Sequence, residues 1–158
     1  MKIGVKMPSW KYSVALDPDT TAIAAGRDLR ISYKAAVEIL REIKGLRVDK
    51  AEKLLEDVIE KRRPIPFRCF NGKVGHRKGE SFGPGRYPVK AAKYILKVLR
   101  EAKANAEYKG LDVTKLWIVH AAAHKGIKIR KYKPRAFGRA TPFFQQLVHV
   151  EIGVEERT

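Results

Sequence analysis

Cysteine is nearly absent from this chain of 158 residues, since Cys69 is the only one. A single cysteine excludes an internal disulfide and a zinc site built from several cysteines. Long apolar runs are missing too, because no stretch approaches the roughly 20 apolar residues that cross a bilayer. The first ten residues, MKIGVKMPSW, also lack the apolar run of a signal peptide. We therefore expect a soluble, cytoplasmic protein without a membrane partner.

Acidic residues are scarce and unevenly placed. The chain has 34 Lys and Arg against 17 Asp and Glu, which gives a net charge of +17 and a pI near 10.1. No Asp or Glu occurs between Asp112 and Glu151. Thermophilic proteins also accumulate basic residues, but they match them with Glu in ion-pair networks. The unmatched excess in this chain indicates a protein that binds nucleic acid.

The centre of the acid-free segment is residues 120–142, HAAAHKGIKIRKYKPRAFGRATP. Alternating apolar segments flank it, LWIVH before and LVHVEIGV after, and such alternation is typical of strands. The middle is basic and punctuated by proline and glycine, which favours a turn. At about 3.3 Å per residue, an arm of about twelve residues per strand reaches on the order of 40 Å. We therefore expect residues 120–147 to form a long hairpin that leaves the globular body.

The rest of the chain predicts a small α+β fold. Residues 21–31 alternate like a short strand, and two amphipathic helices follow. The first helix has Ser32 as its N-cap, and the second begins at Asp49, which would form a capping box with Glu52. Pro88 opens a third helix of about 21 residues, the expected spine of the core, with the apolar stripe Ala92, Ile95, Leu96, Leu99, Ala102 and Ala106. We expect one domain over 1–158, in which a small three-stranded antiparallel sheet packs on three helices.

Two segments fall outside this plan. Residues 1–21 have no sustained period, and we expect an irregular N-terminal extension that crosses another surface. Residues 64–87 alternate glycines with cations, so they form a basic, glycine-rich insertion that is too long for a compact connector. Its cations, together with Phe67, Phe70 and Phe82, are suited to contact phosphates and bases. A flexible loop without a fixed role is the alternative.

The candidate RNA-binding residues form two sets. Arginine can donate to two phosphate oxygens or stack on a base, and aromatic rings can stack on splayed bases. The hairpin set is Lys125, Lys128, Arg130, Lys131, Tyr132, Lys133, Pro134, Arg135, Phe137, Gly138 and Arg139. The set on the body and the insertion is Arg27, Arg30, Lys34, Arg62, Arg63, Arg68, Lys73, His76, Arg77, Lys78, Arg86 and His120.

A catalytic site is not expected in this sequence. Cys69 has no motif partner that would make it a nucleophile. We expect His120 and His149 to face each other across the strand roots of the hairpin, on a sheet surface rather than in a pocket. Two ligands alone do not define a metal site. We therefore predict that the protein is no enzyme and uses no metal or cofactor.

The hairpin also carries a specific motif pattern. Arg130 is followed by Arg135-Ala136-Phe137-Gly138-Arg139, and then by His149-Val150, Ile152 and Val154 at fixed spacing. With the upstream runs Ala104-Asn105-Ala106-Glu107 and Gly110-Leu111-Asp112, this pattern resembles the large-subunit ribosomal protein twenty-two family, which is counted as seventeen in eukaryotes. The likeness covers roughly residues 22–155. The extension and the insertion are similar to the archaeal and eukaryotic branch of that family.

The resemblance implies a structural constituent of the large ribosomal subunit. Members of the family bind large-subunit rRNA with a small α+β body near the exit of the peptide tunnel, and their hairpin lines the tunnel wall. Here the hairpin would be Gly126 to Ala140, with Lys133-Pro134-Arg135 near the inner turn. Tyr132 and Phe137 stand where many relatives carry further Arg. The expected partners are rRNA, neighbouring ribosomal proteins and the nascent peptide, with one copy of the chain in each ribosome.

A DNA-architectural protein is the alternative function. Such proteins also extend a β-ribbon arm and can place a proline at its tip to wedge base steps apart. They usually dimerise to present two arms, whereas we predict a monomer. Bending of duplex DNA would distinguish the two functions.

Overall fold

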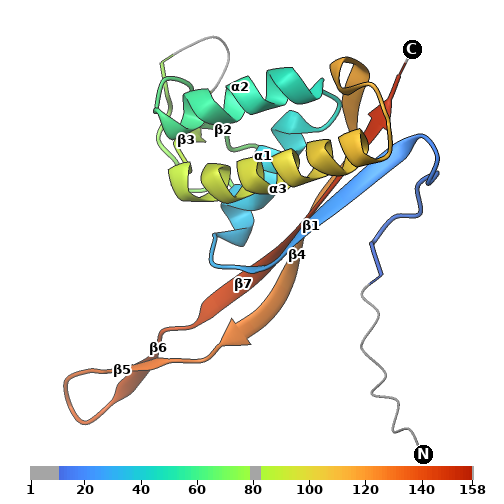
Figure 1. Ribbon diagram of the computed structural model, residues 1–158. Coiled ribbons are helices and arrows are strands. Elements are labelled where there is room, and N and C mark those ends of the chain that lie inside the picture. The colour runs from blue at the N-terminus through green and yellow to red at the C-terminus, as the bar shows by residue number, and fades with distance from the viewer. Residues whose placement is uncertain (1–10, 79–82, 158) are drawn as a thin grey trace, which may run out of the picture.

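The computed structural model describes residues 11–78 and 83–157 (Figure 1). Its helices are α1 (Tyr33–Ile43), α2 (Val48–Ile59) and α3 (Val89–Tyr108), and a short 3-10 helix, η1 (Val113–Lys115), follows α3. The long strands are β1 (Thr21–Leu29), β4 (Leu116–Ile129) and β7 (Gln145–Glu156). Two short ladders pair β2 (Ile65–Pro66) with β3 (Gly85–Arg86) and β5 (Tyr132–Pro134) with β6 (Ala140–Pro142). The predicted α+β fold is confirmed.

The long strands form one antiparallel sheet in the order β1-β7-β4. Alternation along the central strand decides which face is covered, because Val148, Val150, Ile152 and Val154 all point to one side and are fully buried. Helices α1 and α3 pack on that side, and α2 packs on α3 further out (Figure 1). The core therefore lies between the sheet and the helix pair α1 and α3.

Helix α3 is the spine that its apolar stripe predicted. Each of the six predicted stripe residues is buried, and Leu99 at the centre is 0% exposed. Pro88 occupies the N-cap position, one residue before the helix, and Gly110 follows its end with a φ of +80°. Proline cannot supply a helical N–H, and glycine adopts positive φ without steric cost, so both ends of the helix are set by the sequence.

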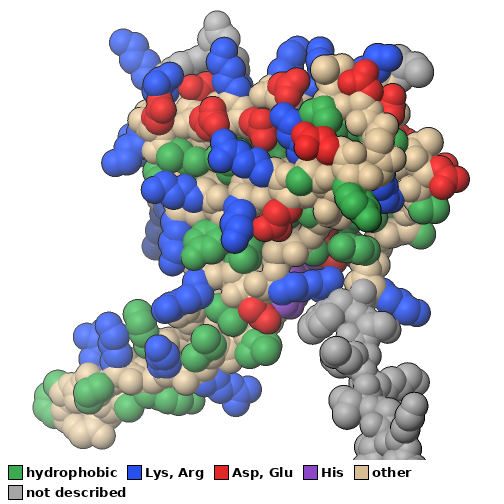
Figure 2. Space-filling model, in the orientation of Figure 1, with side chains coloured by type: hydrophobic (Ala, Val, Ile, Leu, Met, Phe, Trp, Pro, Cys, Tyr) green, Lys and Arg blue, Asp and Glu red, His purple; other side chains and the backbone are tan. Residues whose placement is uncertain are grey.

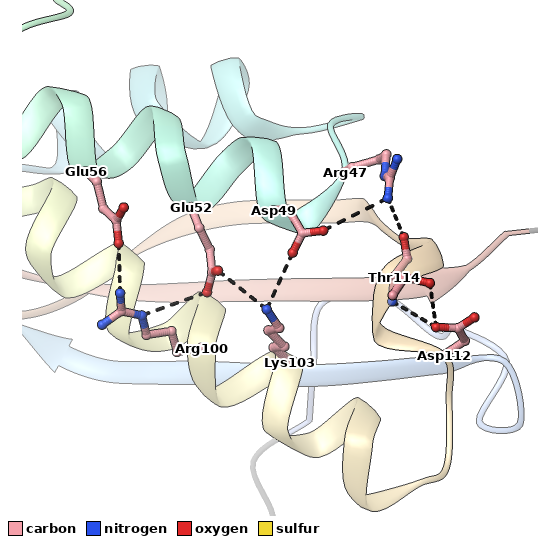
Figure 3. A network of polar contacts seen from close by, with 8 residues as sticks. All are labelled: Arg47, Asp49, Glu52, Glu56, Arg100, Lys103, Asp112 and Thr114. Atoms are coloured by element: carbon pink, nitrogen blue, oxygen red, sulfur yellow. Dashed lines mark hydrogen bonds and ion pairs between the residues drawn. The ribbon is translucent and has the colours of Figure 1, made fainter.

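The start of α2 differs from its prediction. The helix begins at Val48 after Arg47 as N-cap, and no side chain caps it. Asp49 and Glu52 reach sideways to α3 instead, where each carboxylate lies 3.5 Å from Lys103 Nζ (Figure 3). The capping-box prediction was wrong, because cross-helix ion pairs occupy both carboxylates.

The insertion 64–87 is fastened to the body at several points. The ladder of β2 and β3 closes its ends, and the Phe67 ring is buried in the core. Glu38 of α1 is only 2% exposed, and its Oε1 accepts the backbone N–H groups of Cys69 and Phe70 at 2.8 Å each. Phe67 is therefore unavailable to stack on bases, which corrects that expectation. Phe82 lies outside the described residues.

Alanine at Glu38 should lower the free energy of unfolding by about 1–3 kcal/mol, because two backbone donors in a part-buried position lose their acceptor. Urea denaturation measures this loss. Glu42→Ala is the matched control, since Glu42 lies one turn further along α1 and its ion pair among the described residues is with the exposed Arg68 at 3.9 Å. That variant should lose no more than about 1 kcal/mol. Equal losses for the two variants would contradict the anchoring role of Glu38.

Residues 11–20 cross the face of the sheet that the helices leave open. Glu151 and Gly153 alternate with the buried valines of β7 and so point to this face. The backbone N and the Oγ of Ser13 donate to Glu151 Oε2 at 3.0 and 2.6 Å. Leu16 lies over Gly153, where an added Cβ would meet Leu16 Cδ1 at 2.8 Å. The extension thus covers the middle of the sheet.

Candidate nucleic-acid interface

The hairpin is the most extended part of the molecule. Strands β4 and β7 pair from Leu116 and Glu156 at the root to Ile129 and Gln145, and β5 and β6 continue the ribbon (Figure 1). At the tip Arg135 N donates to Arg139 O at 2.7 Å, and Phe137 and Gly138 form the turn with φ near 60°. Every residue from 128 to 144 is exposed. This segment, which we call the arm, has no core of its own.

Seven basic side chains line the arm and its base. Figure 2 shows that Lys and Arg side chains along the arm are interspersed with apolar ones. The seven are Lys125, Lys128, Arg130, Lys131, Lys133, Arg135 and Arg139. Within the described parts of the chain, none of the seven forms an ion pair. Some lie on aromatic rings instead, as Lys133 Nζ does 4.0 Å from the ring centre of Phe143. Their charge is therefore available to an external anion.

Three basic candidates on the body also contact neutral groups instead of forming ion pairs with described residues. Arg30 Nη2 donates to Gln145 Oε1 at 2.9 Å, which ties β1 to the start of β7. Lys34 and Arg86 lie over the rings of Phe70 and Phe67, at 5.6 and 5.7 Å. All three cations border one hollow beside the start of α1. Sequence reasoning named them without being able to place them together.

Other body candidates lie apart from this group or already have partners. Arg62 pairs with Asp57 and Glu60, Arg68 faces Glu42, and Arg77 donates to the carbonyl oxygen of Gly85. Lys73, His76 and Lys78 are exposed on the insertion. Arg27 lies near Glu151 on the open face of the sheet, and Arg63 lies beside Lys50 beyond α2. The structure therefore does not bring the whole body set into one surface.

His120 and His149 do not face each other, so that expectation was wrong. The register places His124 opposite His149 and His120 opposite Gly153. The strands continue pairing out to Ile129, and a bulge after Ile118 shifts the register, so the residue opposite His149 lies four positions nearer the tip than predicted. His149 Nδ1 instead accepts a hydrogen bond from the backbone N–H of Asp28 at 3.0 Å.

His120 belongs to a polar cluster beneath the extension. Its Nε2 lies 3.2 Å from Ser13 Oγ and 3.8 Å from Glu151 Oε2, and burial lowers its pKa despite the carboxylate. Burial alone would raise the pKa of Glu151, but the Ser13 hydrogen bonds and the charges of His124 and Arg27 outweigh it, so the pKa lies below its ordinary value. The cluster holds the extension on the sheet.

The described residues form neither a metal cluster nor a membrane-spanning helix. Across 11–78 and 83–157, no group of three or more His, Cys, Asp or Glu side chains is arranged to hold a metal ion. No helix in those ranges combines the length and the apolar character needed to cross a membrane. The arm and its base are thus the chemically distinctive surface.

A comparison with protein families identifies the fold that carries this arm. The family model described as ribosomal protein L22p/L17e matches residues 24–155, which include the three helices, the arm and most of the three-stranded sheet. The chain belongs to the ribosomal protein L22p/L17e family. It is therefore a structural protein of the large ribosomal subunit that acts in translation, and not an enzyme.

Similar L22p/L17e proteins occur in archaea. The large ribosomal subunit protein uL22 of Thermofilum pendens is 57% identical, with 95% of this chain and 99% of the relative covered. Those of Methanocaldococcus jannaschii and Archaeoglobus fulgidus are each 56% identical, with 96% of this chain covered and 98% and 100% of the relatives. The predicted archaeal and eukaryotic type of the family is confirmed by these archaeal relatives.

Two residues of the arm and one at its base in this L22p/L17e protein escaped sequence reasoning. Ile127, Phe143 and Phe144 are exposed large apolar side chains, as Phe137 is at the tip. Soluble monomers rarely leave such rings in water unless a partner covers them, and RNA bases can do so. The only signal in the sequence was the position of Phe143-Phe144 between two segments that already looked like strands, where aromatic residues are expected to be buried.

Proposed function

We propose that this chain binds large-subunit rRNA chiefly through its arm, and that the arm lines the wall of the peptide exit tunnel while the body lies near the tunnel exit. The observation that supports rRNA binding best is the charge of the arm. Seven cations on an exposed ribbon, without an ion pair to any described residue, match the phosphate density of folded RNA. The tunnel position rests on the family.

The arm would bind RNA by two kinds of contact. Each Lys or Arg that reaches a phosphate releases condensed counterions, which gives affinity without sequence preference. The exposed rings of Tyr132 and Phe137 add stacking on splayed bases, worth about 1–3 kcal/mol each when fully inserted. Pro134 removes a backbone donor and limits the conformations of the ribbon near its tip. The ordering of the arm would thus be offset by contacts along its whole length.

The proposed contact residues are both sets named from the sequence, with the hairpin set as the principal one. On the body, Arg30, Lys34 and Arg86 extend the same surface, whereas Arg62, Arg68 and His120 already have partners within the chain. Neighbouring ribosomal proteins would contact the remaining surface. At the tip, the side of Lys133 to Phe137 that is turned away from rRNA would face the passing nascent peptide.

Sedimentation with the large subunit in high salt tests this function. We expect the full-length chain to remain with the subunit, to bind structured rRNA fragments as a monomer, and to leave duplex DNA unbent. Tight bending of duplex DNA by a dimer would overturn the proposal and favour an architectural protein that uses Pro134 as a wedge. A fluorescence bending assay on duplex DNA, run beside the rRNA fragments, measures both.

A further inference from the structure

Two adjoining hollows lie where the arm meets the body. One, of about 620 Å³, opens between the start of α1, the start of α3 and the insertion, and the other, of about 640 Å³, opens between the start of α1 and the base of the arm. They share Ile31, Ser32, Lys34 and Phe70, so they form one continuous depression, which we call the α1 groove. Figure 1 shows that the starts of α1 and α3 lie on the arm's side of the body.

The lining of the α1 groove carries charge of one sign only. Six cations border the two hollows, and among the described residues neither lining includes an Asp or a Glu. They are Arg30, Lys34, Arg86, Lys90, Lys125 and Lys128. Further along α3, by contrast, Arg100 and Lys103 are matched by carboxylates of α2 (Figure 3). The groove is therefore a concentrated, uncompensated positive site.

Aromatic rings hold three of these cations in place. Lys34 Nζ lies 5.6 Å from the ring centre of Phe70, and Lys125 Nζ lies 5.2 Å from that of Tyr33. Arg86 lies over Phe67 in the same way. A ring orients a cation without neutralising it, whereas a carboxylate does both. The groove thus presents positioned charges together with the half-buried ring of Phe70, which lines both hollows.

The two helix starts at the groove carry the wrong charge for their own stability. Lys34 lies in the first turn of α1 and Lys90 in the first turn of α3, and neither first turn contains an acid. The positive end of a helix dipole favours Asp or Glu there, as α2 has in Asp49. Lysines at both positions oppose the helix dipole, and an anion bound at the groove would reverse the penalty.

We infer that the α1 groove binds one unpaired nucleotide of an RNA strand. Its phosphate lies among Lys34, Arg86 and Lys90 at the two helix starts, and its base lies against Phe70. An extruded nucleotide can enter a hollow of this size, whereas a base inside a duplex cannot present its face to a ring. This inference rests on the proposed function, because the same RNA would hold the arm, and it adds a separate attachment point on the body.

Binding of a fluorescent ten-nucleotide single-stranded oligouridine to the full-length chain tests the inference. Lys34→Gln with Lys90→Gln should weaken binding about tenfold. The slope of the logarithm of the affinity against the logarithm of the salt concentration should become less steep by about 1.4, or about 0.7 for each lost phosphate contact. The melting temperature should stay level or rise, since both lysines oppose helix dipoles. Phe70→Leu should weaken binding about fivefold or more without changing the salt dependence, because it removes stacking and no charge.

Lys50→Gln with Lys53→Gln is the matched control, because both lysines are exposed on α2 and the charge change is the same. Equal weakening by the control and the groove pair would overturn the inference. If Lys34→Gln with Lys90→Gln weakens binding strongly and a well-folded Phe70→Leu variant binds as the unaltered chain does, the groove binds only phosphate. That result would overturn the assignment of a nucleotide to the groove. Full binding by both groove variants, with loss only on changing the arm, would remove the groove site and leave the proposed function standing. Failure of the unaltered chain to bind rRNA would instead overturn the proposed function.

Discussion

Alanine at both Arg135 and Arg139 should weaken binding of the full-length chain to an rRNA fragment about tenfold or more, while the melting temperature stays nearly unchanged. Both side chains are exposed at the arm tip, and neither forms an ion pair with any described residue. The fold therefore loses little without them. Each lost contact to a phosphate removes a charge-assisted hydrogen bond, worth about 1.5–3 kcal/mol, and one released counterion.

Filter binding over a range of salt concentrations measures both consequences of this change. The logarithm of the affinity should fall less steeply with salt, by up to about two units of slope for the pair. Arg100→Ala with Arg157→Ala is the control, because these arginines already pair with acids of their own chain and belong to neither candidate set. A large drop in melting temperature for the tip variant would show that the arm is part of the core, contrary to its exposure.

Alanine at Leu99 should lower the free energy of unfolding by about 2–5 kcal/mol. Leu99 is fully buried in the middle of α3, and α3 contacts both the sheet and α2. Removing most of its side chain leaves a cavity that the two rigid layers cannot close. The fold therefore loses the transfer free energy of the removed atoms and also bears the cost of the cavity. Urea denaturation at neutral pH measures the change.

Ile127→Ala provides the control for the core variant. Ile127 is also a large aliphatic residue, but it is 65% exposed at the base of the arm. Its truncation should change the stability by less than about 0.5 kcal/mol. Equal destabilisation at the two positions would mean that the arm packs as tightly as the helices.

Periodicity accounts for what the sequence predicted well. The stripe of α3 and the alternation of β7 each identify a buried face, because a helix repeats at 3.6 residues and a strand at two. Both faces are buried as expected, and Gly45 and Gly110 end α1 and α3 with positive φ. The absence of acids from 113 to 150 likewise indicated the arm, since an unmatched basic ribbon has no place in a core.

The predictions that failed depend on contacts between distant segments. The capping box at Asp49 does not form, because Asp49 and Glu52 pair with Lys103, which lies more than fifty positions further along the chain. The partner of His149 depends on a bulge in the opposite strand, which no local pattern marks. Glu38, for which no prediction was made, is buried because the insertion folds over it. Local patterns cannot show which distant group will compete for a side chain.

The α1 groove was only half visible in the sequence. Five of its six cations appear in the candidate sets, but the six come from the segment after β1, α1, the insertion, α3 and β4, and only the fold brings them to one place. Lys90 was not named at all, because a lysine on a predicted helix is usually solvated surface. Its position in the first turn of α3, where it opposes the dipole, is a signal that helix-capping rules could have found.

The ion pairs between α2 and α3 also have a consequence for how the chain meets its partner. They neutralise the carboxylates and cations of one end of the body, while the arm at the other end keeps all of its charge. The molecule is therefore a strong electric dipole as well as a polycation. In the field of a polyanion it experiences a torque before any contact forms, and it approaches arm first. Raising the ionic strength would shorten the range of that alignment to about 8 Å at physiological salt.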